Sequence, residues 1–151
     1  MRKLGLIGLL AYGFAGFGST AVAEMPTEFG AIEGKVVWVD FWASWCAPCR
    51  RSFPWMNAMH EKYAAEGLQI IAVNVDKERE LADEFLTESP ARFRLHFDPA
   101  GKLAEAFEVQ AMPSSFLLDG NGNVIAKHYG FKLANTEEYE QQIRAALGAA
   151  Q

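Results

Sequence analysis

Apolar residues fall into short unbroken runs that alternate with helical patterns along the chain. The runs 35–41 (KVVWVDF) and 68–75 (LQIIAVNV) are almost continuously hydrophobic, which is typical of strands buried on both faces. Between them a helical pattern covers 46–66, and Gly67 ends it. Pro54 lies inside this pattern, and we expect it to kink the helix because it removes one backbone hydrogen bond.

The second half of the chain predicts shorter elements. Residues 78–88 form an acidic amphipathic helix with Leu81, Phe85 and Leu86 on one side. The sequence Gly-Asn-Gly-Asn at 120–123 is a strong signal for a hairpin. The other predicted elements are a short strand, a helical piece, the two hairpin strands and a closing helix, at 94–98, 101–107, 115–119, 124–129 and 136–147.

This order of elements indicates the fold class. The first strands should be parallel, because a helical crossover separates them. The hairpin and the final helix then complete the chain. We predict one α/β domain with a central mixed sheet and helices on both faces.

Composition agrees with one folded domain and narrows the partners. The chain has 151 residues, of which 50% are hydrophobic and 22% charged. Its formal net charge of −5 argues against a nucleic-acid partner, since such proteins carry a basic face. Only two cysteines are present, too few for a fold held together by several disulfides.

The N-terminus has the pattern of a targeting segment. Residues 1–3 give a positive start, 4–23 are uncharged, and Ala21-Val22-Ala23 offers small residues before a cleavage point. We predict a signal peptide over 1–23 and a domain over 24–151, in an extracytoplasmic compartment that permits disulfides. The alternative is an uncleaved membrane anchor, although five glycines make this segment a weak membrane span.

The candidate chemistry lies in Cys46-Ala47-Pro48-Cys49, directly after a buried strand and at the start of a helix. A cysteine at a helix N-terminus is stabilised as a thiolate by the unpaired backbone N–H groups and the helix dipole. The two-residue gap brings the second sulfur within reach, and Pro48 fits the first turn of a helix. These features predict a disulfide that opens and closes without refolding of the chain.

Three other readings of the cysteine pair fit the sequence less well. Zinc needs two further ligands, yet no other cysteine exists and His60, His96 and His128 are scattered. Haem attachment needs histidine directly after the second cysteine, where this chain has Arg50. A bridge over so short a loop constrains the unfolded chain little, which disfavours a purely structural role. We therefore predict redox chemistry with no metal and no cofactor.

Two segments also resemble a known family. Residues 39–49 (VDFWASWCAPC) resemble the active-site segment of the thioredoxin superfamily, and 109–119 (VQAMPSSFLLD) resemble its second landmark, a strand entered through proline. Residues 68–86 are similar to the periplasmic TlpA/ResA branch. The resemblance implies a thioredoxin-like fold, thiol–disulfide oxidoreductase activity and protein substrates.

By this resemblance, Cys46 is the exposed nucleophile that forms a mixed disulfide, and Cys49 is the buried resolving thiol. Asp40 matches the buried acid that deprotonates the resolving cysteine. The residues themselves support this role, because a carboxyl within an apolar strand should have a raised pKa. The alternative is an acid bonded to solvent or backbone at the strand end. Many members of the branch instead place a glutamate after the second strand, where this chain reads DKE at 76–78, so the identity of the proton acceptor stays open.

The resemblance also implies a substrate-binding rim. Pro113 matches the cis-proline that faces the cysteine pair, and Met112 would offer its backbone to an extended substrate segment. Trp45 and Met112 would then form an apolar rim around Cys46. Three other aromatic residues are expected to pack in the core: Trp38, Phe41 and Phe116.

The direction of electron flow is a hypothesis at this stage. The pair Ala47-Pro48 lacks the histidine that makes some periplasmic members strongly oxidising. We expect a reductant, re-reduced by a membrane electron donor, with apo-cytochrome c as one target. The alternatives are a general disulfide oxidant and a chaperone or assembly factor with incidental thiols. About a dozen residues separate Glu24 from the first strand, so the N-terminal hairpin usual in the branch is not expected here.

Overall fold

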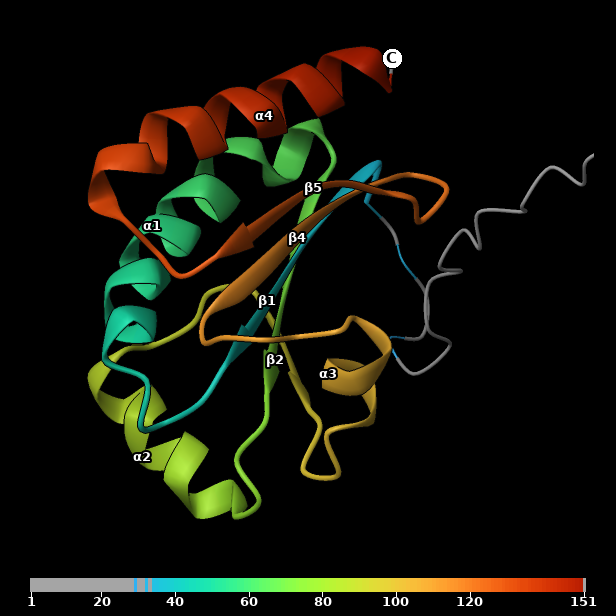
Figure 1. Ribbon diagram of the computed structural model, residues 1–151. Coiled ribbons are helices and arrows are strands. Elements are labelled where there is room, and N and C mark those ends of the chain that lie inside the picture. Colours follow the sequence, from blue (N-terminus) through green and yellow to red (C-terminus); the bar gives the residue numbers. More distant parts are fainter. Residues whose placement is uncertain (1–28, 30–31, 33, 151) are drawn as a thin grey trace, which may run out of the picture.

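The computed structural model describes residues 29, 32 and 34–150 (Figure 1). The predicted signal peptide and its cleavage point lie outside these residues. The strands are β1 (Val36–Trp42), β2 (Leu68–Asn74), β3 (Arg94–Phe97), β4 (Ser114–Asp119) and β5 (Val124–Tyr129). The helices are α1 (Ala47–Tyr63), α2 (Arg79–Glu88), α3 (Lys102–Ala106) and α4 (Thr136–Ala149), with short 3-10 turns η2 (Ala64–Glu66) and η3 (Leu133–Asn135).

The strands form one mixed sheet in the order β3-β2-β1-β4-β5. β1 pairs in parallel with β2, and β2 pairs in parallel with β3, as the helical crossovers predict. β4 runs antiparallel to β1 and forms a hairpin with β5. The predicted fold class is therefore confirmed, and β1 lies at the centre of the sheet.

Helices cover both faces of the sheet, but unequally. Side chains of α1, α2 and α4 pack in one apolar cluster with Trp38 and Trp42 of β1. On the opposite face α3 and Phe29 pack against Val39 and Phe41. Figure 1 shows the same division, with α3 alone on its side of the sheet. Because side chains alternate along a strand, Asp40 belongs to the α1 face with Trp38 and Trp42.

The sequence places the start and end of α1. Cys46 is its N-cap, and Pro48 lies in the first turn, where a missing N–H leaves no bond unmade. The helix continues through Pro54 into η2, and Gly67 ends it at φ 110°, a left-handed conformation that favours glycine.

Most predicted boundaries agree with the structure to within one or two residues. The hairpin turn is organised by Asp119, whose carboxylate accepts hydrogen bonds from the backbone N–H groups of Asn121 and Asn123. The three apolar residues expected on one side of α2 differ in their burial. Phe85 is buried and Leu86 partly buried, but Leu81 is exposed, because α2 lies at the margin of the cluster and Ala82 takes the inward position.

Within the part of the chain that the structure describes, no helix is both long enough and apolar enough to cross a bilayer. The same residues contain no group of three or more histidine, cysteine or acidic side chains placed to hold a metal ion.

Candidate active site

Cys46 and Cys49 form a disulfide at the N-terminus of α1, with their Cα atoms 5.3 Å apart. The backbone N–H of Cys49 donates to Cys46 Sγ at 3.3 Å and to the Cys46 carbonyl oxygen at 3.1 Å, so an N–H of the first helical turn already points at the first sulfur. In the reduced protein this donor and the helix dipole would stabilise a Cys46 thiolate.

The expected exposure of Cys46 is wrong for this oxidised form, in which the residue is 2% exposed. Its sulfur is bonded to Cys49, which is itself fully buried, and it also accepts the bond at the helix start. Access to the disulfide therefore requires a partner to displace neighbouring side chains, or the chain to open locally.

A buried carboxylate holds the loop that precedes the cysteines. Asp76, just after β2, accepts hydrogen bonds from the backbone N–H of Ser44 (2.8 Å) and from its hydroxyl (2.9 Å). Asn74 Nδ2 donates to the same carboxylate at 2.7 Å. This network ties the end of β2 to the loop before the helix, and so fixes where α1 begins.

Asp40 is the buried acid under the other side of the site. It lies on the α1 face of β1, against which α1 packs with the fully buried Cys49. Ser115 of β4, its register neighbour, donates to Asp40 Oδ1 at 2.6 Å. Asp40 Oδ2 is buried and has no hydrogen-bond partner among the described residues. Burial raises the pKa of Asp40 to about 7, and the Ser115 hydroxyl opposes this rise.

The acids that the sequence left as alternatives have different surroundings in the structure. Asp76 is bonded to the active-site loop, and Glu78 is exposed as the N-cap residue of α2, with no side-chain bond to its helix. Asp40 differs from Asp76 and Glu78 in lying within the central strand β1 with a raised pKa. A buried carboxyl with a pKa near neutrality has the property that a proton acceptor needs.

The predicted rim residues lie as follows. The Met112–Pro113 peptide bond is cis, and Met112 packs against the cluster that contains both cysteines. Trp45 is 70% exposed beside Cys46. The three aromatic residues assigned to the core are all buried there: Trp38, Phe41 and Phe116.

Sequence reasoning missed Ser115 and Ser44, which donate hydrogen bonds to Asp40 and Asp76 respectively. Ser115 could have been found as a polar residue within a buried strand, the same signal that marks Asp40. His128, set aside as a scattered histidine, is the register neighbour of Ser115 and stacks on Trp38 at 5.5 Å. Burial lowers the pKa of His128, and its Nε2 lies 2.8 Å from Gln142 Oε1.

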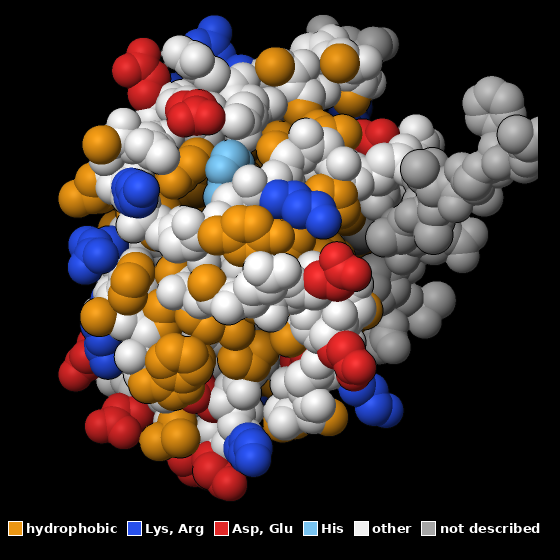
Figure 2. All heavy atoms as spheres, viewed as in Figure 1, with side chains coloured by type: hydrophobic (Ala, Val, Ile, Leu, Met, Phe, Trp, Pro, Cys, Tyr) orange, Lys and Arg blue, Asp and Glu red, His pale blue; other side chains and the backbone are white. Residues whose placement is uncertain are grey.

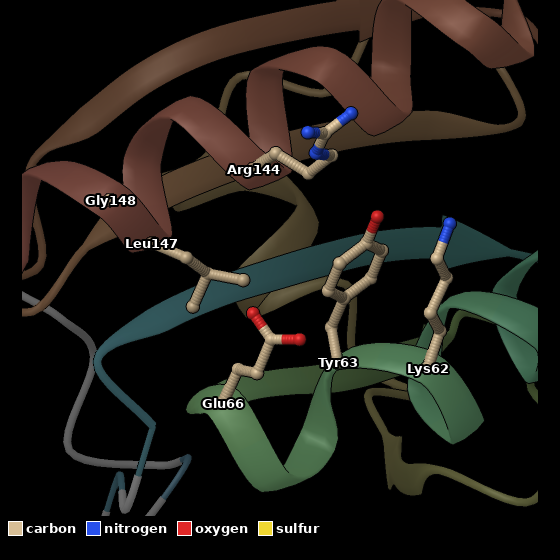
Figure 3. Close-up of a pocket in the computed structure, with 6 residues that line it drawn as sticks. All are labelled: Lys62, Tyr63, Glu66, Arg144, Leu147 and Gly148. Atoms are coloured by element: carbon tan, nitrogen blue, oxygen red, sulfur yellow. The ribbon is translucent and has the colours of Figure 1, made fainter.

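A hollow of about 520 Å³ lies between the C-terminal end of α1 and α4 (Figure 3). The side chains that line it include two positive groups, Lys62 and Arg144, and one negative group, Glu66. Glu140 of α4 accepts a hydrogen bond from the Tyr63 hydroxyl and forms an ion pair with Lys62. This region joins two helices, and it lies more than 15 residues along α1 from Cys46, roughly 25 Å at the helical rise.

A central mixed sheet, a disulfide-bonded cysteine pair at a helix N-terminus and a cis-proline before β4 define a thioredoxin-like protein. The Redoxin family matches residues 17–143, and the chain belongs to this family of the thioredoxin superfamily.

Relatives of known name agree with this assignment. The chain is 33% identical over 120 residues to the thiol-disulfide oxidoreductase ResA of Bacillus cereus (strain ZK / E33L), covering 80% of this chain and 66% of that protein. A Chlorobium tepidum structure bearing the name thiol:disulfide interchange protein DsbE is 53% identical, with a TM-score of 0.74 over 76% of this chain and 82% of that one. StoA of Bacillus subtilis, at 21% identity and a TM-score of 0.64, shares the fold over 74% of this chain and 84% of its own.

The ResA relatives are longer proteins than the segment they share with this chain. The chain spans 66% of the length of the Bacillus cereus relative, just under two thirds, and 55% of the Bacillus subtilis one.

Proposed function

We propose that this protein is an extracytoplasmic thiol–disulfide oxidoreductase that reduces disulfides in other proteins. The observation that carries the proposal is the pairing of a helix-capping disulfide with a buried acid whose pKa is about 7. The names of the relatives support the reaction class. The N-terminal pattern of the sequence supports the compartment.

The reaction begins with the reduced protein. The Cys46 thiolate attacks one sulfur of a substrate disulfide, forming a mixed disulfide and releasing the other substrate sulfur as a thiolate. The Asp40 carboxylate accepts the Cys49 thiol proton, and the Cys49 thiolate attacks Cys46 Sγ. This second attack releases the reduced substrate and leaves the Cys46–Cys49 disulfide. Two electrons have moved from the protein to its substrate.

Each further turnover requires two electrons from a dithiol donor. We propose a membrane protein for this role, and the cysteine pair of apo-cytochrome c as one substrate. The exposed Trp45 and the cis Met112–Pro113 segment would form an apolar rim, where the Met112 backbone would pair with an extended substrate.

A trapping experiment tests the exchange mechanism. Cys49→Ala, expressed in the native compartment, should accumulate mixed disulfides with protein substrates through Cys46, because the resolving thiol is absent. Cys46→Ser is the matched control and should trap none. A Cys46→Ser protein that keeps full biological activity would instead support a binding or assembly role with incidental thiols.

The reduction potential tests the direction. A reductant should have a value nearer to about −270 mV than to about −120 mV in a glutathione or thioredoxin equilibrium. A value near the oxidising end would reassign the protein as a general disulfide oxidant.

A further inference from the structure

A second, smaller hollow lies next to the cysteine pair, between the loop after β1 and helix α2. Its volume is about 220 Å³, and it opens beside Trp45, the residue before Cys46. A substrate held at Cys46 would place its neighbouring side chains at this opening. The lining residues come from the loop, from α1 and from α2: Ser44, Trp45, Arg50, Leu81, Glu84, Phe85 and Glu88.

The walls of this hollow are apolar and partly exposed. Trp45 is 70% exposed and Leu81 is 44% exposed, while Phe85 is buried among them. Trp45 and Leu81 belong to the few large hydrophobic side chains that are exposed among the described residues. Exposed apolar side chains gathered next to a reactive group indicate contact with a partner.

The charges around the hollow are unequal. Arg50 is already engaged, since it forms an ion pair with Glu88 and its guanidinium lies 4.7 Å from the centre of the Phe85 ring. Glu84 has no ion-pair partner among the residues that the structure describes. Among the described residues that line it, the hollow therefore offers one unpaired carboxylate and no unpaired cation. Figure 2 shows acidic side chains gathered over the α2 region, at the lower left, close to hydrophobic ones.

We propose that this hollow binds an arginine or lysine side chain of the protein substrate, from the segment next to the cysteine under attack. The inference rests on the proposed function and names a substrate feature that the cysteine chemistry does not select. Such a side chain has an apolar stem that packs on Leu81 and a cationic head that lies over the Trp45 ring and pairs with Glu84.

The other kinds of side chain fit less well. An acidic side chain would meet Glu84, and the one nearby cation, Arg50, is held by Glu88 and Phe85. An apolar side chain would pack on Trp45 and Leu81 but would bring Glu84 out of water without a partner. The protein should therefore prefer basic substrates through contacts that are independent of electron transfer.

Disulfide-bonded peptides of one sequence test this preference. They differ only at the residue beside the attacked cysteine, which is arginine, glutamine or glutamate. The reduced full-length protein should reduce the arginine peptide with a kcat/KM about fivefold above that of the glutamate peptide at low salt, the size expected of an exposed ion pair. Raising the salt to 1 M should weaken the preference.

Two variants locate the effect. Glu84→Gln should reduce the arginine-to-glutamate ratio to near one. Glu137→Gln, at an exposed position in the first turn of α4, should keep the ratio because it removes the same charge away from the hollow. Both proteins are compared with the wild type by circular dichroism before the kinetics, so that a folding defect is recognised.

Three outcomes would overturn the proposal. Equal kcat/KM values for the three peptides would show that the hollow does not discriminate between substrate side chains by charge. A faster glutamate peptide would assign the hollow to acidic partners through Arg50. An arginine preference that Glu137→Gln abolishes and Glu84→Gln retains would place recognition elsewhere. Failure of the proposed function looks different, because the wild type would then reduce none of the peptides above the rate of Cys46→Ser.

Discussion

Two buried carboxyl groups, one within strand β1 and one just after the end of β2, differ in how many hydrogen bonds they accept. Asp76, which follows β2, accepts three hydrogen bonds from Ser44 and Asn74. Asp40, in the central strand, accepts one from Ser115, and its second oxygen has no partner among the described residues. Both acids are more than nine-tenths buried, so burial alone does not separate their roles.

The difference lies in what each group does for the loop and the helix. A buried carboxylate whose oxygens are bonded to a neighbouring segment holds that segment in place. A buried carboxyl with an unbonded oxygen is costly to ionise, which raises its pKa toward neutrality. The first arrangement holds the loop before the cysteines, and the second leaves a carboxyl whose pKa is about 7, as the proposed proton acceptor requires.

The largest expected effect is on stability at alkaline pH, in the oxidised Asp40→Asn protein. The pKa of Asp40 is raised from 3.8 to about 7, so the unfolded chain ionises at lower pH than the folded one. The stability that this group contributes is complete below about pH 4 and is lost as pH rises through about 7. Asparagine does not ionise, so at pH 8.5 the variant should exceed the wild type by up to about 4 kcal/mol.

Guanidinium unfolding of both oxidised proteins at pH 4 and pH 8.5 measures this effect. The gain from Asp40→Asn should be small at pH 4 and large at pH 8.5. The same variant should resolve mixed disulfides more slowly near pH 7, because Cys49 loses its proton acceptor. A gain that is equal at both pH values would mean that Asp40 does not titrate between them.

Asp76→Ala, just after the end of β2, should change the free energy of unfolding in the opposite direction. It leaves the Ser44 N–H, the Ser44 hydroxyl and Asn74 Nδ2 without their acceptor, which should lower the free energy of unfolding by about 3 kcal/mol at pH 7. Asp83→Ala is the matched control, because Asp83 pairs with Arg79 on the exposed side of α2 and should cost less than about 0.5 kcal/mol. Equal losses for the two variants would refute the view that Asp76 positions the loop.

The contrast between the two acids also shows which features can be predicted from the sequence. Unbroken apolar runs and a cysteine pair before a helix predict the sheet, its parallel strands and the position of the disulfide, because each depends on local pattern. Asp40 stands out for the same reason, as a charge within an apolar strand. The sequence also offers Asp76 as a candidate base, since nothing local distinguishes an acid that is bonded from one that is not.

What the sequence misses depends on contacts between distant segments. Ser115 meets Asp40 across 75 positions, and Ser44 meets Asp76 across 32, through sheet pairing and a loop that no periodicity encodes. The burial of Cys46 and the exposure of Leu81 likewise depend on how the loop and α2 lie on the sheet.

The smallest expected effect comes from Ser115→Ala, which should make Asp40 a still weaker acid. The Ser115 hydroxyl donates to Asp40 at 2.6 Å and so favours the ionised carboxylate. Its removal should raise the pKa of Asp40 further, moving the midpoint of the rate–pH profile for resolution by Cys49 upward by about one pH unit. Ser114→Ala is the matched control, because its hydroxyl donates to the Ala111 carbonyl oxygen instead. Stopped-flow kinetics and carboxyl ¹³C titration should both detect the change in Ser115→Ala alone. Equal midpoints in the two serine variants would mean that Ser115, like Ser44, only holds the fold, and the contrast between the two buried acids would then rest on Asp40 Oδ2 and its burial.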